Sequence, residues 1–144
     1  MRTIIASRLL RNTLIADAVA SGALALLQVL GHAPLARLTA LPAALLLATG
    51  LFLAGYVALL GLMARAGRLP VWLVTLVVAG NIGWALGCMA LAGGAAGLAA
   101  NSLGTAYLLA QAAAVLVFAA LEYAGLRRSR PAGEGATRLS ASAI

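Results

Sequence analysis

Four long runs of apolar residues alternate with short polar segments along the chain. The runs cover residues 12–31, 41–64, 70–92 and 103–126. Each run has about the 20 residues that a helix needs to cross the hydrocarbon core of a bilayer. Helices satisfy their own backbone hydrogen bonds, so runs of this length in lipid favour helices over open strands. The pattern predicts an all-α integral membrane four-helix bundle over residues 1–126.

The segments between the runs are too short to hold another domain. The link "RAGRLP" after the second run is so short that we expect the second and third helices to be antiparallel neighbours. The longer link "HAPLARLTALP" after the first run contains Pro34 and Pro42, which favours a loop. Residues 127–144 are rich in polar residues, and we expect them to form a disordered cytoplasmic tail.

The ten basic residues, all Arg, are distributed unevenly between the two sides of the predicted bundle. Nine of them precede the first run, follow the second or follow the fourth, and only Arg37 lies in a link on the other side. Positively charged loops stay in the cytoplasm, so both termini are expected there. The net charge of +7 then favours contact with anionic lipid headgroups. No nucleic-acid partner is expected, because no soluble basic domain is present.

Composition supports a membrane location. Hydrophobic residues make up 64% of the 144 positions and charged residues 9%, whereas soluble domains carry about a quarter charged residues. A signal peptide is a weaker interpretation of the basic start and first run, because the run is long and contains Asp17. The abundance of Ala, Leu and Arg without Lys suggests a GC-rich bacterial genome, and hence the bacterial inner membrane.

Polar residues recur at helical spacing and mark one face in three of the four runs, while the second run offers only Thr49 and Tyr56, seven residues apart. In the first run the spacing is i, i+4 and i+11, and in the fourth it is i, i+4 and i+15. The candidate polar interior comprises Asp17, Ser21, Gln28, Asn81, Trp84, Tyr107, Gln111 and Glu122. These side chains either hold the helices together, at about 0.6 to 2 kcal/mol per hydrogen bond, or line a wet site.

Small residues are also frequent in the third run. Gly80, Gly83 and Gly87 are typical of positions where helix backbones approach closely, which favours the first of these two interpretations.

The two carboxylates in the runs are the most informative residues, because a charge at the centre of a span costs roughly 2.5 to 3.5 kcal/mol. Counted from the ends of the runs, Asp17 lies about 7 Å and Glu122 about 6 Å inside the cytoplasmic boundary. One hypothesis pairs each acid with an arginine, Arg65 being the candidate partner of Asp17. The other brings the two acids together as a proton or cation site.

Motifs for catalysis or cofactor binding are not found in the sequence. It has no HExxH motif, no phosphate-binding Gly loop and no Ser/His/Asp set. With one Cys and one His, no metal site, cofactor or enzymatic activity is expected. An enzyme acting on lipid or quinone is the least favoured alternative.

Three segments together resemble an uncharacterised family of small four-span bacterial integral membrane proteins. They are "ADAVASG" in the first run, "GNIGWAL" in the third and "AQAAAVLVFAALEYAGLRR" in the fourth. The likeness covers most of residues 12–128 and implies the four-span architecture but no activity.

Two functions are compatible with these features. The first is movement or sensing of a small solute or ion, with Asp17 and Glu122 at the inner mouth and Asn81 and Gln111 near mid-depth. The second is a non-catalytic accessory subunit that packs in a homo-oligomer or against a larger membrane protein. A wet cleft that reaches Asp17 favours the first, and a dry bundle favours the second.

Overall fold

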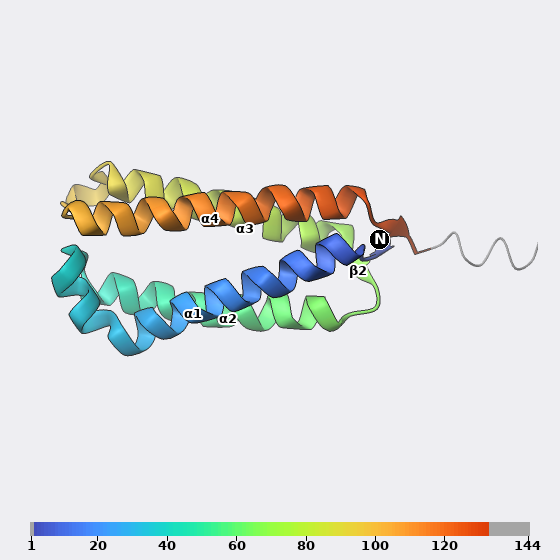
Figure 1. Cartoon of the computed structure of the whole chain (residues 1–144), viewed down its shortest axis with the longest axis horizontal. Helices are drawn as coiled ribbons and strands as arrows, with labels where there is room; N and C mark the ends of the chain where they lie inside the picture. The colour runs from blue at the N-terminus through green and yellow to red at the C-terminus, as the bar shows by residue number, and fades with distance from the viewer. Residues whose placement is uncertain (1, 133–144) are drawn as a thin grey trace, which may run out of the picture.

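The computed structural model describes residues 2–132, and four long helices account for most of them (Figure 1). All four are long and apolar enough to cross a membrane, which confirms the predicted all-α four-span architecture. The helices are α1 (Arg8–Thr39), α2 (Ala43–Arg65), α3 (Val71–Ala92) and α4 (Ser102–Arg127). They run lengthwise beside one another, so the start of α1 and the finish of α4 lie at the same end of the bundle. We call this the terminal end, and the opposite one the loop end.

The bundle is built from two helical hairpins. The α1 helix packs along α2, and α3 packs along α4, while α1 also contacts α4 and thereby joins the hairpins. The α2 and α3 helices run antiparallel, as expected from the short link between them. Their backbones are not closely packed along their length, and contacts between them are made by side chains such as Phe52 and Trp84.

The first helix is longer than the apolar pattern predicts. It continues through Pro34, whose ring removes a backbone donor and bends a helix without always ending it. Figure 1 shows a bend in the last part of α1. The helix ends at Ala40, which has a left-handed φ of 57°. Asn101, from the segment before α4, then donates from its side chain to the Leu38 carbonyl at 2.7 Å.

A small antiparallel sheet at the terminal end is not predicted by the sequence pattern. Its strands are β1 (Thr3–Ile5), β2 (Leu69–Pro70) and β3 (Arg130–Pro131), with β1 in the centre. The sheet joins the start of the chain to the α2–α3 link and to the segment after α4. Part of the expected disordered tail is thus ordered, and residues 133–144 lie outside the described residues.

Ser7 fastens the start of α1 to the finish of α4. Its hydroxyl accepts from the Leu10 amide at 3.2 Å, which caps α1, and donates to the Gly125 carbonyl at 2.8 Å. A Cβ on Gly125 would lie 2.7 Å from the Leu10 Cα, so only glycine lets the two backbones come this close. This crossing and the sheet hold the terminal end closed.

We predict that Gly125→Ala lowers the melting temperature of the purified protein in detergent. The added methyl would overlap the Leu10 backbone, and such overpacking costs about 1 to 3 kcal/mol. Gly61→Ala is the matched control, because a Cβ there meets nothing within 4 Å. Equal melting temperatures for the two variants would contradict this packing.

Candidate functional site

All four helices contribute a side chain to one buried polar group, which we call the acid cluster. Asp17 and Glu122 are fully buried in it, and Ser21 and Asn81 are nearly so. The α1 helix provides two members and each other helix one. The members are Asp17, Ser21, Tyr56, Asn81 and Glu122.

Asp17 accepts three hydrogen bonds, all from neutral groups. Its Oδ1 accepts from the Ser21 hydroxyl at 2.9 Å, one turn along α1. Its Oδ2 accepts from the Tyr56 hydroxyl at 2.9 Å and from the Asn81 amide at 3.1 Å. The carboxylate therefore joins α1, α2 and α3 at one point.

Asn81 brings the second carboxyl group to the first. Its Nδ2 donates to Asp17 Oδ2 and to Glu122 Oε2, each at 3.1 Å, so the two acids are neighbours. The other Glu122 oxygen, Oε1, is buried and has no hydrogen-bond partner among the described residues. Two carboxylates this close repel each other in a medium of low dielectric constant. A proton or cation held between them would lower that repulsion.

Arginine does not supply the missing positive charge within residues 2–132. Each of the nine Arg side chains there is exposed, including Arg65 at the end of α2. All hydrogen bonds to Asp17 and Glu122 from this part of the chain come from neutral donors. The structure thus brings the two acids together and leaves Arg65 apart from them.

The acid cluster lies well inside the bundle rather than at its terminal end. Asp17 is about 14 Å along α1 from Arg8, where the helix begins. Asn81 is about 15 Å along α3 from Val71. Glu122 is closer to the end of α4, but helical side chains lean toward the N-terminus of their helix. Its carboxyl group therefore reaches inward to Asn81.

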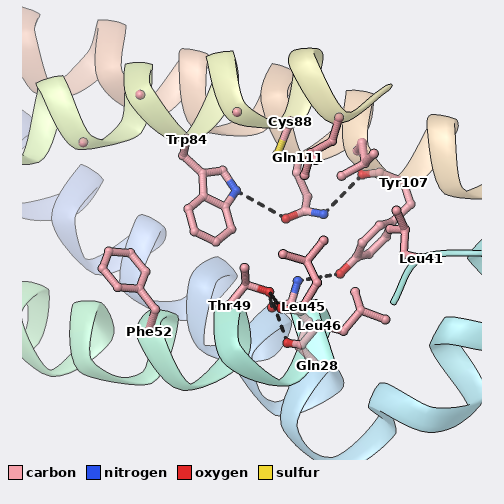
Figure 2. Close-up of a pocket in the computed structure, with 15 residues that line it drawn as sticks. Gln28, Leu41, Leu45, Leu46, Thr49, Phe52, Trp84, Cys88, Tyr107 and Gln111 are labelled. Carbon is pink, nitrogen blue, oxygen red and sulfur yellow. Dashed lines mark hydrogen bonds between the residues drawn. The ribbon is translucent and has the colours of Figure 1, made fainter. Parts of the chain in front are cut away.

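The remaining predicted polar residues form a second group nearer the loop end (Figure 2). Gln28 donates to the Tyr107 hydroxyl at 2.7 Å and accepts from the Thr49 hydroxyl at 3.0 Å. The Trp84 indole donates to Gln111 at 3.4 Å. These bonds link α1 to α2 and α4, and α3 to α4, so this group does hold helices together.

A cleft of about 450 Å³ lies beside this second group, between α2 and α3. Most of its lining is apolar, and Cys88 is part of it. Gly80, Gly83 and Gly87 form part of the α3 side, where an added Cβ would meet nothing within 4 Å. Within the described chain these glycines therefore do not bring two helix backbones together, contrary to expectation, and they leave space instead.

Tyr56 and Thr49 are site residues that the predicted set lacks. Both lie on α2, seven residues apart, so they share one face of that helix. This spacing was a usable signal, but a lone Tyr and a lone Thr in a span are also common on ordinary packing faces. His32 lies within α1 rather than in a loop, with its Nδ1 at 3.0 Å from the Val29 carbonyl.

No protein-family model, curated protein or solved structure matches this chain. The functional argument therefore depends on the residues and their geometry.

We predict opposite outcomes for Asn81→Ala and Arg65→Gln. Loss of the Asn81 amide leaves buried carboxyl oxygens without their donor, which costs about 1 to 3 kcal/mol, so the melting temperature falls. Arg65 is exposed, and such substitutions stay within about 0.5 kcal/mol. A large loss of stability in Arg65→Gln would instead support an ion pair with Asp17.

Proposed function

We propose that this multi-pass membrane protein moves or senses a small cation, a proton included, through the polar interior of its bundle. One observation carries the proposal: two fully buried carboxyl groups share the Asn81 amide, and Glu122 Oε1 has no partner among residues 2–132. Buried acids inside a membrane are costly, and they commonly mark ion and proton pathways. A cluster held by neutral donors alone is suited to binding a positive charge.

The surrounding packing supports access from one side. A small chamber of about 70 Å³ touches Ser21, Tyr56 and Asn81, which are the three partners of Asp17. Toward the terminal end, an apolar core that includes Leu10, Leu14 and other buried side chains lies in the way. A cation that moves across the bundle must therefore be accompanied by helix motion, whereas sensing needs only binding.

The orientation and cellular location belong to the same proposal. The bias of Arg toward one side favours cytoplasmic termini. The resemblance to small four-span bacterial proteins favours the bacterial inner membrane. Under this orientation the cation would reach the acid cluster from the outer side.

An accessory subunit is the competing proposal, and the α3 glycines favour it. Gly80, Gly83 and Gly87 leave a small-residue surface on which the helix of a second copy or a larger membrane protein could pack. In that case the acid cluster would serve only to hold the four helices together, and its replacement would affect assembly but no ion signal.

Proton flux into liposomes tests the moving role. The purified chain is reconstituted with a pH-sensitive dye inside, and a potassium diffusion potential drives protons inward. We expect flux above that of protein-free liposomes, reduced at least tenfold by Asp17→Asn and by Glu122→Gln. Thr75→Ala is the control, because the Thr75 hydroxyl is exposed and bonds only to its own helix at Val71.

Infrared difference spectroscopy of the carboxyl bands tests the sensing role. Changing the pH or the cation around the purified protein should change bands that disappear in Asp17→Asn and Glu122→Gln but persist in Thr75→Ala. Wild-type flux equal to that of protein-free liposomes, together with unchanging carboxyl bands, would contradict the proposal and favour the accessory role.

A further inference from the structure

The cleft and the small chamber meet at a pair of aromatic side chains. The Phe52 and Trp84 rings are stacked, with centroids 6.0 Å apart and planes inclined by 10°. Both residues, and Gly80 as well, line the cleft on one side and the chamber on the other. The pair is therefore the partition between an apolar space and the space next to the acid cluster.

The two spaces differ in size. The cleft, at about 450 Å³, lies within the range of small-molecule sites, roughly 300 to 1,000 Å³. The chamber, at about 70 Å³, has room for a few water molecules of roughly 30 Å³ each, or for a group of that size. A ring or a branched body fits the first space and not the second.

Both spaces have mostly apolar linings, but they differ in the polar residues beside them. No charged side chain lines the cleft, and its polar groups are largely bonded to one another. The chamber instead is lined in part by Ser21 and Tyr56, whose hydroxyls donate to Asp17, the Tyr56 hydroxyl also lying 3.2 Å from Asn81 Oδ1. The lone pairs of these hydroxyl oxygens remain available to a donor. Beyond them lie the two carboxyl groups and the unpartnered Glu122 Oε1.

We propose that the cleft and chamber together bind an amphiphilic amine. Its apolar body occupies the cleft, and its ammonium group enters the chamber, donates to Ser21 and Tyr56, and is stabilised by the negative charge of the acid cluster. Passage between Phe52 and Trp84 requires the stacked rings to separate, and their faces attract the cation on its way. The inference rests on the proposed function and names the substrate class of that site.

The charge of the ligand is the feature to test. The probe is 2-phenylethylammonium, with 2-phenylethanol as a neutral compound of similar size and shape. Binding is followed by tryptophan fluorescence of the purified full chain in a nonionic detergent. Trp72→Phe removes the exposed second tryptophan, so the signal comes from Trp84 at the partition.

We expect the amine to bind saturably and at least tenfold more tightly than the alcohol. Asp17→Asn and Glu122→Gln should each weaken amine binding at least tenfold. Gly80→Leu fills the junction of the two spaces without removing a hydrogen bond and should abolish binding. Gly55→Leu is the matched control, since Gly55 is exposed on α2, lines neither space and has nothing within 4 Å of an added Cβ.

Equal affinity for the alcohol and the amine would overturn the inference, and so would amine binding that survives Gly80→Leu. The liposome assay separates this failure from failure of the proposed function. Proton flux that depends on Asp17 without amine binding would leave the cation pathway standing and remove only the amine. Absence of flux, of carboxyl band changes and of amine binding would contradict both.

Discussion

The Asn81 amide that joins the Asp17 and Glu122 carboxyl groups is the interaction on which the arrangement of the bundle depends. An acid within a span is costly unless it is solvated by other protein groups, and apolar helices in lipid have little else to fix their relative rotation. Tyr56, Ser21 and Asn81 provide those groups from three helices, and Glu122 adds the fourth. The hydrogen bonds around the Asp17 carboxylate and the shared Asn81 amide therefore fix which face of each of the four helices points inward.

The two ends of the bundle differ because they are held together differently. At the terminal end, the sheet, the Ser7 hydrogen bonds and the glycine crossing at Gly125 close the structure over an apolar core. Toward the loop end, α2 contacts α1 and α3 contacts α4, but α2 and α3 separate and leave the cleft. Motion that opens a path through the bundle would therefore have to begin between α2 and α3, whose backbones are not closely packed.

Helical spacing was sufficient to predict the inward faces, because a period of 3.6 residues places Asp17, Ser21 and Gln28 in one row whatever the tertiary structure. It also placed Asp17 and Glu122 at similar depth in the first and fourth runs, but it left open whether the two acids meet each other or an arginine. It could not decide what lies next to the acids, because Arg65 follows the second run closely enough to be a candidate partner, and only the structure shows that its side chain is exposed.

Other features carry no periodic signal at all. Strands of two or three residues are too short to show alternation, so the sheet at the terminal end could not be predicted. Pro34 is compatible with both a loop and a bent helix, so its presence alone could not decide between them. Glycine allows close packing and open space equally, so Gly80 in α3 and Gly125 in α4 have opposite roles that only the neighbouring helix determines.

A double-mutant cycle on Asp17→Asn and Glu122→Gln, measured as the free energy of unfolding in mixed micelles, tests the central claim most directly. If the two acids interact across the Asn81 amide, the effect of neutralising one depends on the charge of the other, with a coupling of about 0.5 to 3 kcal/mol. Neutralising the first acid should relieve the repulsion, and neutralising the second should add no further stability. Effects that add to within about 0.5 kcal/mol would show that the two carboxyl groups are independent and would contradict the account.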